Sequence, residues 1–307
     1  MDLNTVTRII PARTRQDLAA LGEGAVPLAG GSVLFAEPNP ALHTLVDLQP
    51  LGWPNFVQSA EGLEVAATTT LASISRLPNN RLTNEQLAHE QLADARLAES
   101  GEGWAAHPLF YQCCTALFGS FKVWNVATVG GNICTALPAG PMTSLFAALD
   151  AEALIWRPDG SDIRMPVARL VTGNTTTALE SGDVLRSLHI PLRSLNSRTA
   201  YRKIALSALG RSGAVLIGRL DPIDGTFVLT VTAATVRPEQ LRFAALPSPR
   251  ELSETLGGID SWFTDAHGAA DWRLAVSRVL AEEILVELAT TAPQEDLTGS
   301  ADETSTR

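Results

Sequence analysis

The chain has 307 residues, of which 45% are hydrophobic and 18% are charged. A chain of this length and composition can bury a large core and is expected to divide into two or three domains. Its formal net charge is −10, and Lys122 and Lys203 are its only lysines. The arginines are spread without a basic run, so we predict that the protein binds no nucleic acid.

No apolar run approaches the roughly 20 residues that a bilayer span needs, and the first residues lack the basic and apolar stretches of a signal peptide. We therefore expect a soluble, cytoplasmic protein with no membrane span. The cysteines are the adjacent Cys113 and Cys114 and the isolated Cys134. This spacing forms neither a CxxC pair nor a disulfide framework, which argues against an iron–sulfur or structural zinc site in this chain.

Residues 1–55 predict a small first domain of the βαβ type. Thr14 is a suitable N-cap for a short helix that ends near Leu21. Strand-like apolar runs follow at residues 26–28 and 45–48.

Residues 56–172 predict a second domain of mixed α/β character. It opens with a hairpin over residues 56–67 and a helix that starts at Thr70. The polar stretch 79–107, with leucines recurring among Glu, Gln and Ala, predicts an exposed amphipathic helix. Apolar spacing then predicts two buried helical segments and a strand, at residues 109–121, 142–149 and 153–156.

A second boundary is expected near residue 172, because Thr-Gly-Asn-Thr-Thr-Thr and Glu-Ser-Gly interrupt the apolar pattern there. The third domain, residues 173–290, is expected to contain strands at 184–190, 214–220 and 226–232 and helices at 250–256 and 272–288. Residues 291–307 carry acids and almost no core-forming side chains, which predicts a disordered tail.

Two Gly-Gly pairs stand where a strand is expected to turn into a helix. They lie in Ala29-Gly30-Gly31-Ser32-Val33 and in Thr128-Val129-Gly130-Gly131-Asn132. Glycine tolerates positive φ and has no Cβ, so successive backbone N–H groups can face one anion such as a pyrophosphate. A single Gly-Gly pair is more often only a tight turn. Two pairs beside Ser, Thr and Asn donors leave a phosphate-binding site and two tight turns as equally good interpretations.

Other catalytic and nucleotide-binding motifs do not occur in the sequence. It contains no GxGxxG and no Gly-Lys pair of a Walker loop. His89-Glu90 is not followed by the second histidine of HExxH, and no GxSxG elbow is present. The five histidines are dispersed. Hydrolytic and metal-dependent chemistry therefore lack candidate residues.

The two glycine motifs, in this order, resemble the FAD-binding medium subunit of molybdenum hydroxylases, the carbon monoxide dehydrogenase and xanthine dehydrogenase family. The family's A-G-G-T/H-S/D loop with a later L-I/V-D-L is similar to residues 29–33 and 45–48. Its V-R-N-x-A/G-T-I/V-G-G-N-I run with a later P-A-x-D is similar to residues 123–133 and 137–141. Its flavoprotein C-terminal domain is similar to residues 182–191 and to Tyr201-Arg202-Lys203. The resemblance spans about residues 5–290.

The resemblance implies an α+β fold. Residues 1–55 and 56–172 would be the two subdomains of a PCMH-type FAD-binding fold. Residues 173–290 would form an antiparallel sheet with helices, as in the flavoprotein C-terminal domain of carbon monoxide dehydrogenase. FAD would lie between the first two units and the third. The FAD contacts that the resemblance implies are Ala29, Gly30, Gly31, Ser32, Val33, Phe118, Thr128, Val129, Gly130, Gly131, Asn132, Thr135, Leu185 and Lys203.

Each of these residues has an implied role. The two glycine loops would hold the FAD pyrophosphate, Phe118 would place an aromatic ring against the cofactor, Thr135 a hydroxyl and Leu185 an aliphatic contact near the flavin. Lys203 would bring positive charge to the flavin N1/C2 carbonyl, with Tyr201 packed near the ring. The alternative for Phe118 and Leu185 is ordinary core packing, and for Lys203 it is an exposed strand lysine.

Two residues depart from the family pattern. Trp124 replaces the usual arginine before Asn125, and Pro141 replaces an aspartate that commonly lies near the ribose or adenylate part of the cofactor. The resemblance therefore implies cofactor binding through the two glycine loops and no contact from these two side chains.

The implied function is that of an oxidoreductase subunit that uses FAD to pass electrons to an external acceptor. Its partners would be an iron–sulfur small subunit and a molybdopterin-binding large subunit, in a heterotrimer or a dimer of heterotrimers. Two alternatives stay open: a free-standing FAD-dependent reductase and a flavin-free scaffold subunit whose glycine loops are only turns. The sequence names neither the substrate nor the electron acceptor.

Overall fold

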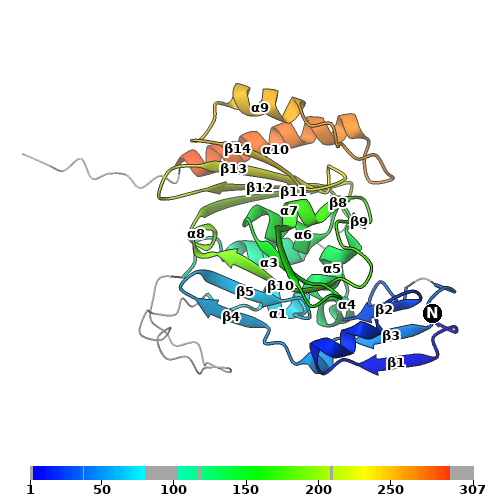
Figure 1. Ribbon diagram of the computed structural model, residues 1–307. Coiled ribbons are helices and arrows are strands. Elements are labelled where there is room, and N and C mark those ends of the chain that lie inside the picture. The colour runs from blue at the N-terminus through cyan, green and yellow to red at the C-terminus, as the bar shows by residue number, and fades with distance from the viewer. Residues whose placement is uncertain (1–2, 37, 80–102, 117–118, 208–209, 291–307) are drawn as a thin grey trace, which may run out of the picture.

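The computed structural model describes residues 3–36, 38–79, 103–116, 119–207 and 210–290. Within these residues the chain forms an N-terminal three-stranded sheet, a central five-stranded sheet and a C-terminal four-stranded sheet, each accompanied by helices (Figure 1). The architecture is the α+β type expected from the resemblance. The stretch predicted as an amphipathic helix falls mostly in residues 80–102, outside the described residues, as do Phe118 and residues 291–307.

The N-terminal unit is a parallel sheet in the order β1-β3-β2. Its strands are β1 (Arg8–Pro11), β2 (Ala25–Leu28) and β3 (Thr44–Asp47). The 3-10 helix η1 (Arg15–Ala20) starts after Thr14, whose N–H donates to the Asp17 carboxylate at 2.8 Å. A 3-10 turn, η2 (Gln49–Leu51), leads out of the unit. The βαβ-type organisation is confirmed; β1, which is mostly exposed and has no alternating pattern, was not predicted.

The central sheet has the order β4-β5-β10-β6-β7, and all neighbouring strands are antiparallel. Its strands are β4 (Phe56–Ser59), β5 (Gly62–Ala66), β6 (Glu152–Trp156), β7 (Asp162–Pro166) and β10 (Val184–Pro191). The hairpin predicted over residues 56–67 is confirmed as β4 and β5.

Short helices surround this sheet. They are α1 (Leu71–Ser75), α3 (Pro108–Ala116), α4 (Phe121–Val126), α5 (Val129–Thr135), α6 (Pro141–Ala148), α7 (Val167–Leu170) and α8 (Leu192–Leu195), with the small hairpin β8 (Val171–Gly173) and β9 (Thr176–Thr177). Thr70 is the N-cap of α1, as predicted, since its Oγ1 accepts the Ser73 N–H at 3.1 Å. Every residue of α6 is buried.

β10 belongs to the central sheet, where it pairs with β5 on one side and β6 on the other. The polar run at 172–182 interrupts the apolar pattern and predicts that this strand belongs to the third domain. That run instead spans the β8–β9 hairpin and the turn into β10. Since sheet pairing outweighs local composition in defining a structural unit, we propose that the boundary lies after Pro191.

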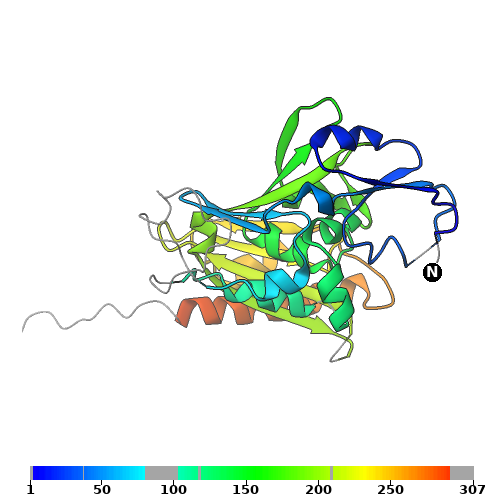
Figure 2. The same ribbon diagram turned by 90° about the horizontal axis from the view of Figure 1, so that it is seen from below.

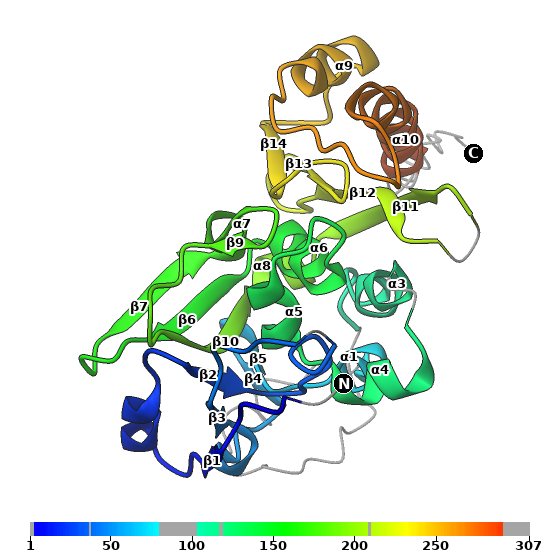
Figure 3. The ribbon, with the colours of Figure 1, turned by 90° about the vertical axis from the view of Figure 1, so that its right-hand side faces the viewer.

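The C-terminal unit is an antiparallel sheet in the order β11-β12-β13-β14. Its elements are β11 (Arg198–Ala205), β12 (Ser212–Leu220), β13 (Phe227–Thr232), β14 (Glu239–Phe243), α9 (Pro249–Gly257) and α10 (Ala270–Thr290). The helices α9 and α10 lie on one face of this sheet, and α3 and α6 lie on the other, toward the central sheet (Figures 1 and 3).

An ion cluster joins the C-terminal sheet to the central unit. Asp150, just after α6, accepts bonds from Arg219, Gln240 and Arg242. Gln240 and Arg219 also donate to the carbonyls of Ala147 and Ala148, at the C-terminus of α6. Because Arg219 is only 5% exposed, this cluster fixes the position of the sheet on α6.

Candidate functional site

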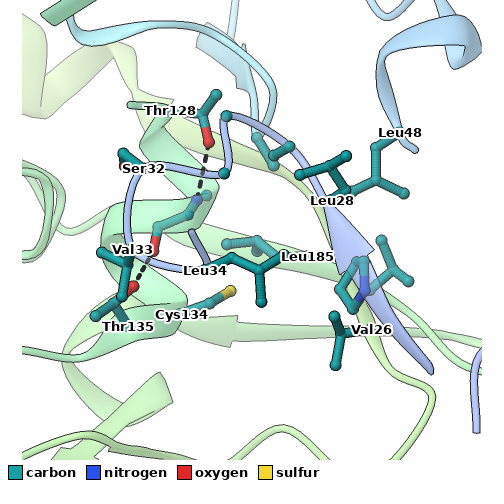
Figure 4. A pocket seen from close by; sticks show the side chains of 18 of the residues that line it. Val26, Leu28, Ser32, Val33, Leu34, Leu48, Thr128, Cys134, Thr135 and Leu185 are labelled. Carbon is teal, nitrogen blue, oxygen red and sulfur yellow. Dashed lines mark hydrogen bonds between the residues drawn. The ribbon is translucent and has the colours of Figure 1, made fainter. Parts of the chain in front are cut away.

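A cavity of about 310 Å³ lies where the N-terminal unit meets the central unit (Figure 4). One wall is the end of β2 with the loop 29–34, the second is α5, and the third is the start of β10. The predicted site residues that line it are Ala29, Gly30, Gly31, Ser32, Val33, Thr128, Gly130, Gly131, Thr135 and Leu185. The structure thus brings both glycine pairs, about 100 residues apart in the sequence, to one cavity.

The conformation and position of the first glycine loop depend on two glycines with different roles. Gly31 has φ +68°, a conformation that side chains rarely adopt. A Cβ at Gly30 would lie 1.8 Å from the carbonyl oxygen of Val126, so only glycine lets the loop approach α4 this closely. Among the described residues, the N–H groups of Gly30, Gly31, Ser32 and Val33 have no hydrogen-bond acceptor. A loop with several free N–H groups beside a cavity can bind an anion.

The second glycine pair lies in the first turn of α5, and the N–H groups around it already have acceptors. It therefore differs from the open anion-binding nest that the sequence predicts. The N–H groups of Val129 and Gly130 donate to Thr69 and Ala67 carbonyls, both at 2.8 Å. The Gly131 N–H donates to Thr128 Oγ1 at 3.1 Å, and that of Asn132 donates to the Thr128 carbonyl at 2.9 Å. This end of α5 therefore offers the cavity mainly the bare Cα of Gly131 and the Thr128 hydroxyl.

Three other predicted residues support the wall of the cavity. Thr135 lines it, but its hydroxyl donates to the Gly131 carbonyl at 2.7 Å (Figure 4). Asn132 Oδ1 accepts the Met142 N–H at 3.0 Å and so ties α5 to the first turn of α6. Val129 is fully buried in the central core. Asn132 and Val129 do not line the cavity.

Leu185 and Lys203 occupy different places. Leu185 is 4% exposed and lines the cavity from β10. Lys203 lies on β11, where its Nζ is 3.4 Å from the Thr115 carbonyl, and it does not line the cavity. Tyr201, two residues earlier, packs against the central core, and burial raises the pKa of its hydroxyl. The flavin contacts implied for Lys203 and Tyr201 stay predictions.

Sequence reasoning missed the apolar part of the cavity, one thiol and the carboxylate residue Asp183, which also lines it. The apolar part is formed by Val26, Leu28, Leu34, Leu48, Leu179 and Val184. Cys134 is exposed and faces the cavity from α5. Helical spacing could have identified Cys134, because it is three residues after Gly131 and therefore lies on the same face of α5.

The two departures from the family pattern lie outside this cavity. Trp124 is half-buried on α4, with its indole ring beside Gly119. Pro141 is a buried residue in the first turn of α6, where a missing N–H costs no hydrogen bond. Neither residue lines the described cavity, so neither narrows or blocks it.

In the described part of the chain, no group of three or more His, Cys, Asp or Glu side chains could hold a metal ion. Among the helices that the described residues form, none has the length and the apolar composition that crossing a membrane requires.

The family model described as the FAD binding domain in molybdopterin dehydrogenase matches residues 6–193, and the chain belongs to this family. This match confirms the resemblance seen in the sequence. FAD is the cofactor of the family, whose enzymes are oxidoreductases.

Relatives agree with this assignment. The chain is 28% identical over 194 residues to the carbon monoxide dehydrogenase medium chain of Afipia carboxidovorans, covering 61% of this chain and 58% of that relative. It is 32% identical over 74 residues to xanthine dehydrogenase 1 of Arabidopsis thaliana, covering 24% of this chain and 5% of that relative. The matched segments thus span less than two thirds of either relative.

Two solved structures have the same fold. Carbon monoxide dehydrogenase from Oligotropha carboxidovorans superposes with a TM-score of 0.75 at 20% identity, covering 95% of this chain and 100% of that chain. Quinoline 2-oxidoreductase from Pseudomonas putida 86 gives 0.72 at 20% identity, covering 94% and 99%. These superpositions extend the shared fold through the C-terminal sheet and confirm the predicted fold class.

Proposed function

We propose that this chain is the FAD-binding electron-transfer subunit of a multi-subunit molybdenum hydroxylase. The observation that carries the proposal is the loop 29–34, which lines the cavity: its Gly30, Gly31 and Ser32 N–H groups have no acceptor among the described residues, and most of the other lining side chains are apolar. An anion at this loop with an apolar ring system beside it is the pattern expected of a bound dinucleotide.

The residues of the cavity fit one part of FAD. The amides of Gly30, Gly31 and Ser32 would hold the pyrophosphate, because they have no acceptor among the described residues. The bare Cα of Gly131 leaves room on the opposite wall, where only Thr128 Oγ1 lies within 4 Å of an added Cβ. A cavity of about 310 Å³ is smaller than the whole dinucleotide. The rest of FAD would therefore extend beyond it.

When bound, FAD accepts and releases electrons one or two at a time, and so it can connect one-electron carriers to a two-electron acceptor. This chain would contribute binding and orientation, with the glycine loop fixing the pyrophosphate and the aliphatic side chains excluding water from the cavity.

The proposed partners are an iron–sulfur small subunit and a molybdopterin-binding large subunit, in a heterotrimer or its dimer. Support comes from the relative named as a medium chain, since that name implies further chains. In this arrangement substrate is oxidised in the large subunit, and electrons reach FAD through the small subunit. A cytoplasmic location stays a prediction.

The proposal is tested first by cofactor content. The full chain, with any chains that co-purify, is denatured and the released flavin is separated by chromatography. We expect one FAD per copy of this chain. FMN alone would contradict the proposal, and absence of flavin would favour the scaffold alternative.

Partner dependence is tested by anaerobic mixing. The FAD-loaded chain is mixed with an aldehyde, a heterocycle or carbon monoxide, with and without the co-purifying chains. We expect flavin bleaching only when the other chains are present. Bleaching in the chain alone would favour a free-standing FAD-dependent enzyme.

A further inference from the structure

Two tryptophans and two arginines join the N-terminal unit to the central sheet next to the proposed cofactor cavity. The guanidinium of Arg15, from η1, lies 4.8 Å from the ring centroid of Trp156 on β6. The guanidinium of Arg186, from β10, lies 4.5 Å from the ring centroid of Trp53, which follows η2. Each unit thus places an arginine over a tryptophan of the other. We call Arg15, Trp53, Trp156 and Arg186 the stacked cluster.

The four side chains of the stacked cluster form one connected set of contacts. The two tryptophan rings meet edge to face at 5.4 Å, and Arg186 also lies 5.7 Å from the ring of Trp156. Arg15 is held by the Ser161 carbonyl at 2.6 Å and by Asp162 at 2.7 Å, in the turn between β6 and β7 and at the start of β7. In Figures 2 and 3, η1 lies beside this hairpin.

Arg186 contributes to the cluster mainly through its flat face. Its side chain is 17% exposed, and its only ion partner among the described residues is Glu64, at 3.8 Å. Burial lowers the pKa of this guanidinium, although the charge of Glu64 opposes the shift. Stacking of a partly desolvated guanidinium on an indole ring is stronger than the same contact in water.

The backbone of Arg186 connects the stacked cluster to the walls of the cavity. Its neighbour Leu185 lines the cavity, and the register of β10 shifts at this point. The Arg186 carbonyl accepts the Ala67 N–H at 3.0 Å, and the Ala67 carbonyl accepts the Gly130 N–H at 2.8 Å. Arg186 is therefore linked to the N-terminal unit through its side chain and to the glycine end of α5 through two hydrogen bonds.

A small apolar core completes the connection. Leu48 from the N-terminal unit and Val184 from β10 are buried in one cluster, with Trp53 and Trp156 packed against it. Both Leu48 and Val184 also line the cavity. A change in how the two units meet would therefore move opposite walls of the cavity relative to each other.

From this geometry we infer that Arg186 is a positioning residue for the cofactor: by lying over the rings of Trp53 and Trp156 it fixes the distance between the first glycine loop and α5. The inference rests on the proposed function, because it concerns FAD in this cavity. Arg186 itself does not line the cavity.

The test measures FAD affinity, FAD dissociation rate and apo-protein melting temperature in the full chain, within its assembly if it purifies as one. In R186A we expect the dissociation constant for FAD to rise on the order of 10-fold, mostly through faster dissociation, as loss of a stacked cation implies. R186K keeps the charge without the planar face, and we expect an intermediate affinity. R202A is the matched control, because Arg202 pairs with Glu283 and Glu287 on the C-terminal unit.

Wild-type affinity in R186A would overturn the inference. So would wild-type affinity in R186K, because it would assign any effect of R186A to charge alone. If R186A does not fold, R186K and Trp53→Leu decide by the same criteria. A melting temperature lowered equally in R186A and R202A, with FAD affinity unchanged in both, would show a merely structural contact. A wild-type chain that binds no FAD would overturn the proposed function itself and the inference with it.

Discussion

The two Gly-Gly pairs look alike in the sequence and differ in the structure. Among the described residues the N–H groups of the first pair have no acceptor, whereas the N–H groups around the second are bonded to Thr69, Ala67 and Thr128. Gly130 is required by close packing, since an added Cβ would lie 2.6 Å from the Cβ of Ala67. The same dipeptide can therefore serve as an anion-binding loop or as a tight junction between elements, and substitutions should separate the two roles.

The largest effect is expected for Gly30→Ala. Its Cβ would overlap the Val126 carbonyl at 1.8 Å, so the loop must leave α4. We expect loss of FAD retention and destabilisation of at least about 1–3 kcal/mol, as for overpacked sites. Gly22→Ala is the control, because nothing lies within 4 Å of an added Cβ there. Released flavin and thermal unfolding measure both effects. Full FAD occupancy in Gly30→Ala would show that the loop does not form the site.

Gly131→Val is expected to act on the cofactor more than on the fold. Gly131 has no positive φ, so the strain that a glycine motif suggests does not apply here. Its side chain would enter the cavity, and FAD affinity should fall by about 100-fold or more, or nearly 3 kcal/mol. Gly130→Val should instead lower the melting temperature of the apo protein. Equal stability losses in the two variants would mean that both glycines serve packing only.

Gly31→Ala should give a smaller loss, because the cost is backbone strain and contact with the Phe35 ring rather than a clash with backbone. We expect about 1–2 kcal/mol of destabilisation, with FAD affinity reduced on the order of 10-fold. Gly31→Asn should retain more affinity, since asparagine tolerates this conformation better. Titration with FAD measures the difference. An Asn variant weaker than the Ala variant would argue that space, and not φ, sets the requirement.

Labelling of the Cys134 thiol tests whether FAD occupies the cavity between the first glycine loop and α5, without a substitution in its wall. It faces the cavity, whereas Cys113 and Cys114 are fully buried. N-Ethylmaleimide should modify one thiol of the flavin-free chain, and FAD should protect it. Because the thiolate is the reacting form, the labelling rate should rise about tenfold per pH unit below the pKa of the thiol. Peptide mass spectrometry identifies the site, with Cys134→Ser as control. Unchanged labelling in the presence of bound FAD would place the cofactor elsewhere.

The sequence by itself determined the units that depend on local pattern. Thr14 and Thr70 mark helix starts, apolar residues on both sides of a turn signal within residues 56–67 mark a hairpin, and the two glycine motifs in order mark the family. These features depend on residues close together in the chain, and capping, turn and periodicity rules describe such short-range interactions.

Only the tertiary structure decided to which unit β10 belongs, which N–H groups lack an acceptor among the described residues, and which side chains complete the cavity. β10 pairs across more than 100 residues with β5, and the Ala67 carbonyl accepts the N–H of Gly130, 63 residues later in the chain. The stacking of Arg186 on Trp53 is likewise long-range. No local pattern encodes such contacts, because they depend on which strands pair and how closely two units approach each other.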